Sequence, residues 1–221
     1  MPCTHENETE VSPGCVCLPL TQLTKQATEF IRDTEDDLLF NHSSRVYCFG
    51  AMSGRHRGLV FDAELLYVAA MFHDIGLTPR YRSASNRFEI DGANAAAEFL
   101  RSRGIAPELV YDVWTAVALH TTPQVPYHMS PVVQLVTAGV EMDVLGLTYA
   151  DFTDDERSRV TSSFPRPTGF KELIIQAFYD GIKDKPESTF GNVKADVLAD
   201  KDPKFVRGNF CSVIRQSRWE S

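Results

Sequence analysis

The sequence predicts an all-α fold, and three observations lead to that prediction. Apolar residues recur at the three-to-four-residue spacing of a single helix face in successive segments. Residues that cap or end helices, such as Asp62 and Gly104, separate these segments. No stretch alternates apolar and polar residues over a length that would favour a strand.

The first predicted helix begins near Thr21, after an N-terminal segment of residues 1–18 that is expected to be a flexible tail. A second helix is expected to begin at Asn41, because asparagine favours the N-cap position. That helix carries His42 together with the apolar residues Val46, Phe49 and Met52.

The third predicted helix runs from Ala63 to Ile75, with Asp62 as its N-cap and Gly76 at its end. Apolar residues cover nearly its whole circumference, so it is expected to be the most buried helix. An arginine-bearing loop follows, over residues 77–86.

The later segments continue the helical pattern. Helices are expected over residues 89–103, 108–120, 131–143, 153–162, 169–183 and 211–219. Residues 185–207 are only weakly patterned. We therefore expect a helical core over residues 19–150 and a C-terminal helical extension, residues 151–221, packed on that core or on another subunit. The sequence leaves open whether the chain forms a homo-oligomer.

The composition is typical of a soluble globular protein, with 43% hydrophobic and 24% charged residues among 221. A net charge of −8 argues against a general nucleic-acid-binding protein, which would need a basic surface. No apolar run approaches the roughly 20 residues that cross a membrane, and the polar N-terminus resembles no signal peptide. Five cysteines without a regular framework favour reduced thiols and a cytoplasmic location.

The adjacent pair His73-Asp74 is the most informative feature of the chain. It ends the apolar run Leu65–Phe72, where burying an imidazole and a carboxylate without partners would be costly. His42 lies upstream, and Asp143 closes a later apolar segment. On crossing helices, two imidazoles and two carboxylates can meet in the core and bind a divalent metal ion, with room left for water or substrate.

These ligand types favour Zn²⁺, although Fe²⁺, Mn²⁺ and Ni²⁺ suit the same nitrogen and oxygen atoms. The ion would lower the pKa of a bound water toward neutrality and so supply a nucleophile. A single core histidine is more often hydrogen-bonded to a carbonyl than bound to a metal, so the prediction depends on the joint pattern.

The same segments resemble a known family. Asn41-His42-Ser43-Ser44-Arg45, Phe72-His73-Asp74-Ile75 and Met142-Asp143-Val144 resemble motifs of the HD-domain superfamily of metal-dependent hydrolases. Within it, the chain looks like the cyanamide hydratase branch, through Arg87-Phe88-Glu89-Ile90-Asp91-Gly92, Ala118-Leu119-His120, Ser163-Phe164-Pro165-Arg166 and Lys185-Pro186. The resemblance covers residues 25–190.

The resemblance implies an HD-like helical bundle with additional C-terminal helices. It implies one divalent ion bound by His42, His73, Asp74 and Asp143, with Asp74 also catalytic. It further implies that His120 orients or polarises the substrate. Two-metal relatives carry a further histidine where Glu89-Ile90-Asp91 stands here, so one ion is favoured. Cyanamide hydratases carry an acidic residue closely after the pocket histidine, whereas Thr121 and Thr122 follow it here, which leaves another nitrile-like or amide-like substrate open.

Arg45, Glu89 and Asp91 are further candidates for substrate binding. Arg45 lies one turn after His42, and it either neutralises a ligand carboxylate or holds an anionic group. Glu89 and Asp91 open a helix, where carboxylates interact favourably with the dipole, so capping is the alternative to substrate contact.

Two enzymatic functions fit these residues, both with a small-molecule substrate and neither with nucleic acid or a membrane. The favoured one is a hydratase that adds water to a small nitrile such as cyanamide, with His120 or a ligand carboxylate as proton donor and urea as product. The alternative is a phosphohydrolase acting on a nucleotide or small phosphomonoester. It would need Arg45 and the loop residues Arg80 or Arg82 at the phosphate, whereas a solvated loop is the other interpretation of those arginines.

Overall fold

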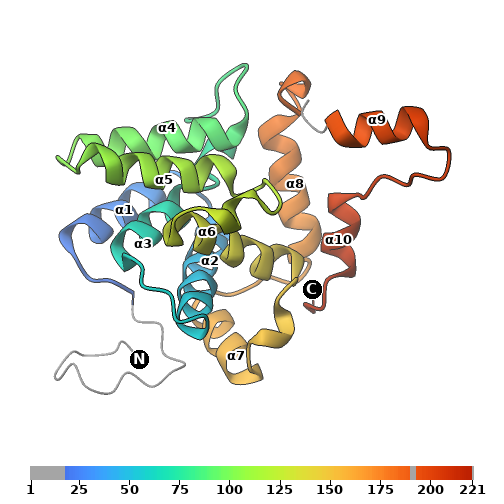
Figure 1. The fold of residues 1–221 in the computed structure, drawn as a ribbon. Helices are drawn as coiled ribbons and strands as arrows, with labels where there is room; N and C mark the ends of the chain where they lie inside the picture. Colours follow the sequence, from blue (N-terminus) through green and yellow to red (C-terminus); the bar gives the residue numbers. More distant parts are fainter. Residues whose placement is uncertain (1–17, 190–192, 221) are drawn as a thin grey trace.

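Helices alone form the regular structure of the described residues, 18–189 and 193–220 of the computed structural model, as the sequence predicts (Figure 1). The helices are α1 (Gln22–Arg32), α2 (Asp37–His56), α3 (Ala63–Phe72), α4 (Phe88–Arg101), α5 (Pro107–Leu119), α6 (Pro131–Val140), α7 (Asp154–Ser163), α8 (Phe170–Ile182), α9 (Val193–Lys201) and α10 (Phe210–Gln216). The tail expected over residues 1–18 lies outside the described residues except for Leu18.

Capping residues explain where the first helices begin. Thr21 caps α1, and the Asp62 side chain accepts from two backbone N–H groups at the start of α3, as predicted. The predicted start of the second helix at Asn41 is wrong. Asp36 caps α2 instead, accepting from Leu39 N, so the helix begins before Asn41 and places that residue in its interior.

Further helix boundaries differ from expectation. The third helix, α3, ends at Phe72 and not at Ile75, and Gly76 lies inside the 3-10 turn η1 (Ile75–Leu77). The sixth helix, α6, ends at Val140 and continues as a π-helical turn, η3 (Glu141–Leu145), which Gly146 terminates in a left-handed conformation. α9 lies in the segment that the sequence leaves weakly patterned; of its apolar residues, Ala195 is buried, whereas Val193, Val197 and Leu198 are exposed.

The core is centred on α3, whose residues Leu65–Phe72 are all buried. α2 and α6 pack against it and against each other, and α4 and α5 lie side by side above them (Figure 1). Gly139 allows the close approach of α2 and α6, because a Cβ there would lie 2.1 Å from the carbonyl oxygen of Val46. This crossing brings the helix that leads to Asp143 against the helix that carries His42.

The C-terminal helices form a second apolar cluster on one flank, where α8 packs on the short 3-10 turn η1 (Ile75–Leu77) and on α10 (Figure 1). Phe170 and Ile174 of α8 and Ile214 of α10 are fully buried there. The remaining 3-10 turns are η2 (Val125–His128), η4 (Tyr149–Asp151) and η5 (Pro186–Thr189). None of the described helices combines the length and apolarity needed to cross a membrane.

Candidate metal centre

His42, His73 and Asp74 converge on one point in the core. His42 projects from the first half of α2, whereas His73 and Asp74 lie where α3 ends and η1 begins. Asp74 has φ −106° and ψ 0°, outside the helical region, so the chain turns and the two adjacent side chains face the same point. The Nε2 atoms of the two histidines are 3.1 Å apart, and Asp74 Oδ2 lies 3.5 Å from His42 Nε2 and 3.3 Å from His73 Nε2.

The hydrogen bonds of the two rings determine where their lone pairs point. His73 Nδ1 donates to the carbonyl oxygen of Ala70 (2.7 Å), and His42 Nδ1 donates to a carboxylate oxygen of Asp143 (2.7 Å). In the neutral rings both lone pairs are therefore on Nε2, where they face each other and the Asp74 carboxylate. Three electron-pair donors at these distances repel one another unless a cation lies among them, so the residues fit a divalent metal ion.

Unpartnered polar atoms reinforce this conclusion. Both carboxylate oxygens of Asp74 and Nε2 of His120 are buried without a hydrogen-bond partner. His120 Nδ1 donates to the carbonyl oxygen of Val117, so its Nε2 lone pair also points inward, 3.6 Å from Asp74 Oδ1. Buried polar groups left unpaired in this way are costly, and a bound ion with its water would satisfy them.

The comparison with known protein families agrees with this geometry. The model of the HD domain matches residues 39–151, just over half of the 221-residue chain. The chain belongs to the HD domain family. HD-domain proteins are metal-dependent hydrolases, and the matched region contains the three converging residues together with His120 and Asp143. No curated protein matches the chain significantly.

Asp143 lies behind His42 and is surrounded by cations. Its carboxylate accepts from Arg45 Nε (2.8 Å) and Arg45 Nη2 (3.0 Å), from Arg166 Nη1 (2.9 Å) and from His42 Nδ1. The ligand atoms of His42, His73 and Asp74 lie within 4.8 Å of one another, and Asp143 is outside that group. Direct coordination by Asp143, as expected from the HD pattern, therefore stays a prediction.

The electrostatics of the centre favour a bound cation. Burial lowers the pKa of His42, which keeps that ring neutral and able to coordinate. Burial alone would also lower the pKa of His73, but the charge of Asp74 and the hydrogen bonds to Asp74 and Ala70 together outweigh it, and the net shift is upward. Burial would raise the pKa of Asp74, yet His73 and His120 hold it well below its usual value. The point between these residues thus attracts positive charge, which a proton or a metal ion can supply.

Two roles were expected for Arg45, neutralising a carboxylate or holding an anionic group, and the structure shows the first. Its side chain has no exposed surface, and besides Asp143 its Nη1 donates to the carbonyl oxygens of Phe164 (3.2 Å) and Pro165 (2.9 Å). The Arg45 and Arg166 charges overcome the effect of burial and hold the pKa of Asp143 far below its usual value. Arg45 therefore neutralises a carboxylate in this structure, and its use as a substrate-binding residue stays a prediction.

Glu89 lies close to His120, because it is hydrogen-bonded to Thr121, the residue that follows His120. The Thr121 hydroxyl donates to Glu89 Oε1, and Arg87 Nη2 donates to the same oxygen (2.6 Å). Burial would raise the pKa of Glu89, but these two hydrogen bonds lower it overall. A carboxylate thus accompanies the pocket histidine in space, although Thr121 and not an acidic residue follows it in sequence.

Asp91 faces a different part of the molecule. It accepts from the backbone and hydroxyl of Ser83 (2.8 and 3.0 Å), from Asn86 Nδ2 (3.2 Å) and from Lys185 Nζ (2.9 Å). These contacts tie the arginine-bearing loop to the segment after α8, and substrate contact by Asp91 stays a prediction.

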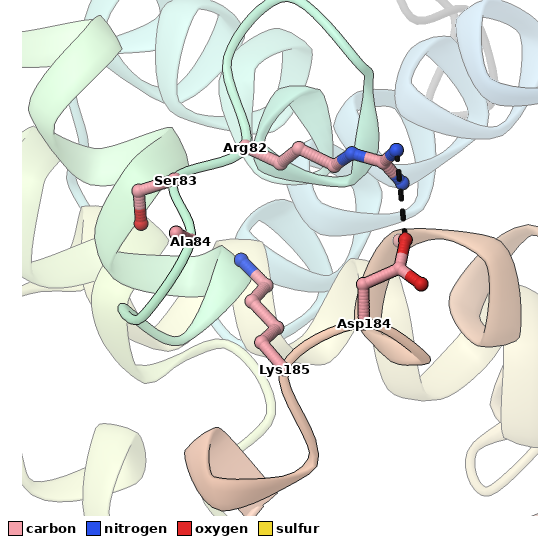
Figure 2. Close-up of a pocket in the computed structure, with 6 residues that line it drawn as sticks. Arg82, Ser83, Ala84, Asp184 and Lys185 are labelled. Carbon is pink, nitrogen blue, oxygen red and sulfur yellow. Dashed lines mark ion pairs between the residues drawn. The ribbon is translucent and has the colours of Figure 1, made fainter.

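A pocket of about 300 Å³ opens beside the ion pair between Asp91 and Lys185 (Figure 2). It is lined by Arg82, Ser83, Ala84, Gly181, Asp184 and Lys185. Arg82 pairs with Asp184 across the pocket and donates to the carbonyl oxygen of Asp180, and Lys185 pairs with Asp91. Both cations of the lining thus have carboxylate partners.

Sequence reasoning missed one buried carboxyl near the centre, that of Glu35. Its Oε2 accepts from the Ser43 hydroxyl (3.5 Å), whereas its Oε1 is buried without a partner. Burial, followed by the charges of Asp74 and Asp36, raises the pKa of Glu35 well above its usual value. The acidic run that contains Glu35 looks like an ordinary helix start, so only the tertiary structure reveals its burial.

Proposed function

We propose that this HD-domain protein is a metal-dependent hydratase that adds water to a small neutral nitrile such as cyanamide and yields urea. His42, His73 and Asp74 would hold one divalent ion, with Zn²⁺ favoured by the nitrogen and oxygen donors. When bound, such an ion lowers the pKa of a water molecule toward neutrality and orients it for attack.

The observation that carries this choice of substrate class is the engagement of Arg45. A phosphoryl substrate needs cationic donors beside the metal, preferably arginine. Arg45 is fully buried, and it donates to Asp143 and to two backbone carbonyl oxygens instead. A neutral nitrile requires no such cation, so it suits a centre in which Arg45 is already engaged.

His120 is the proposed proton donor. Its Nε2 atom is buried without a partner and lies 3.6 Å from Asp74 Oδ1, so the ring can exchange a proton with that carboxylate. As the water oxygen bonds to the nitrile carbon, the proton that the water loses passes by way of Asp74 to the Nε2 lone pair of His120, and His120 gives a proton from that nitrogen to the nitrile nitrogen. A proton shift then converts the imidic acid to urea, and no leaving group departs.

A phosphohydrolase acting on a nucleotide or small phosphomonoester is the second candidate function. Arg82 and Lys185, which line the pocket in Figure 2, are the observation in its favour. Their carboxylate partners, Asp184 and Asp91, reduce the positive charge that they offer to a phosphate.

The test is a paired assay on one metal-analysed preparation of the full chain. One reaction contains cyanamide and is assayed for urea and ammonia; the other contains nucleoside monophosphates and is assayed for phosphate. We expect urea without ammonia, no phosphate, and unchanged turnover in Arg82→Ala. Phosphate release without urea, lost in Arg82→Ala, would reverse the ranking of the two functions.

A further inference from the structure

We infer that Trp219 is a positioning residue for the metal centre, because it clamps the π-helical turn η3 that carries Asp143. This inference depends on the proposed metal site for its functional meaning. Trp219 follows α10 and is only 7% exposed, in contrast to the exposed residues Val206 and Phe210 of the same C-terminal region.

The Trp219 side chain contacts the backbone beside Asp143. Its indole Nε1 donates to the carbonyl oxygen of Met142 (2.7 Å), the residue that immediately precedes Asp143. Its ring packs edge-on against Tyr149 (4.9 Å between ring centres) and lies against Phe49 of α2 (5.8 Å). The indole therefore fixes η3 relative to the helix that carries His42.

Trp219 also holds the arginine that binds the Asp143 carboxylate. The Arg166 guanidinium lies 4.6 Å above the Trp219 ring and 4.0 Å above the Phe170 ring. The same guanidinium donates to the backbone oxygen of Asp143 (2.7 Å) and to its Oδ1 (2.9 Å). One aromatic side chain thus supports Asp143 both through Met142 and through Arg166.

The local backbone explains why η3 needs this support. A π-helical turn is wider and rarer than an α-helical one, and such turns are frequent at functional sites. It ends at Gly146, where an added Cβ would lie 3.4 Å from Ser217 and 3.5 Å from Trp219, so the C-terminal segment packs directly on the turn. Displacement of η3 would move the Asp143 carboxylate away from His42 Nδ1, which it holds at 2.7 Å. His42 Nε2 would then lose its orientation toward the ion.

The experiment compares Trp219→Ala and Trp219→Phe with Trp114→Phe. Trp114 is the other tryptophan of the chain; it is partly buried on α5, and its indole donates to Asn94 Oδ1. Dissociation constants for Zn²⁺ are measured by chelator competition at a temperature at which every variant is folded. We expect Trp219→Ala to weaken Zn²⁺ binding by about tenfold or more, Trp219→Phe to weaken it less, and Trp114→Phe to leave it unchanged. Unchanged Zn²⁺ affinity in both Trp219 variants, even with lower thermal stability, would overturn the inference.

Hydrogen exchange of residues 141–147 in the metal-free protein tests the clamp independently of the metal. Exchange is expected to be faster in Trp219→Ala and Trp219→Phe than in Trp114→Phe. Faster exchange in the Trp219 variants, together with a wild-type protein that binds no Zn²⁺, would support the clamp while contradicting the proposed function. Unchanged exchange in Trp219→Phe would contradict the clamp, even if Trp219→Ala fails to fold.

Discussion

The two sides of the candidate metal centre differ in how their polar atoms are satisfied. On one side, His42 Nε2, His73 Nε2 and the Asp74 oxygens face one another with no donor between them. On the other side, cations and N–H groups engage the whole carboxylate of Asp143. Buried polar atoms without hydrogen-bond partners indicate where a ligand binds, whereas fully hydrogen-bonded ones indicate the support that holds the ligating side chains in place. We call the side with His42 Nε2, His73 Nε2 and Asp74 the unmatched side, and the side with Asp143 the matched side.

The largest effect is expected from the unmatched side. Asp74→Asn keeps the shape of the side chain but removes its charge, and His73→Ala removes an imidazole. Both variants are expected to lose bound metal and hydratase activity together, down to background, because coordinating atoms are removed. Metal analysis and turnover on the same samples check this. Full metal content in either variant would contradict the assignment of that residue as a metal ligand.

A smaller effect is expected from Asp143→Asn on the matched side. The amide keeps a hydrogen-bond acceptor for His42 but weakens the pairing with Arg45 and Arg166. We expect a loss of about 10–100-fold in Zn²⁺ affinity, as is typical when a residue that orients a ligand is replaced. Chelator competition measures it. If Asp143→Asn loses metal as completely as Asp74→Asn, the Asp143 carboxylate is a direct ligand, as the HD pattern predicts.

The crossing that joins the two sides is expected to tolerate no added methyl group. In Gly139→Ala the new Cβ would lie 2.1 Å from Val46 O, so α2 and α6 must separate. We expect a loss of about 1–3 kcal/mol in the free energy of unfolding of the metal-free protein, measured by urea denaturation. Gly208→Ala is the control, because a Cβ there meets nothing within 4 Å. Equal stability of the two variants would contradict the packing described for α2 and α6.

The smallest effect is expected at Glu35, beside the unmatched side. The pKa of Glu35 is raised in the folded protein, so its contribution to stability is present at low pH and is lost as pH rises through the folded pKa. Glu35→Gln cannot ionise. The melting temperature of this variant in chelator should therefore rise relative to wild type as pH increases. A difference that does not change with pH would show that the Glu35 carboxyl is not held protonated.

The sequence predicts the unmatched side better than the matched side. His73-Asp74 at the end of an apolar helix is a local pattern, and it correctly indicates a buried polar pair at the end of α3. The Asp143 support depends on partners far along the chain: Arg45 and Trp219, the latter 77 residues from Met142. No local periodicity reveals such contacts. The Asn41 cap is wrong for a local reason, because Asp36 is an equally good capping residue five residues earlier.

Anomalous diffraction from crystals of the metal-loaded protein tests the central claim most directly. A single peak is expected, bounded by His42 Nε2, His73 Nε2 and the Asp74 carboxylate. A crystal saturated with Zn²⁺ that shows no peak between these three side chains would contradict the account.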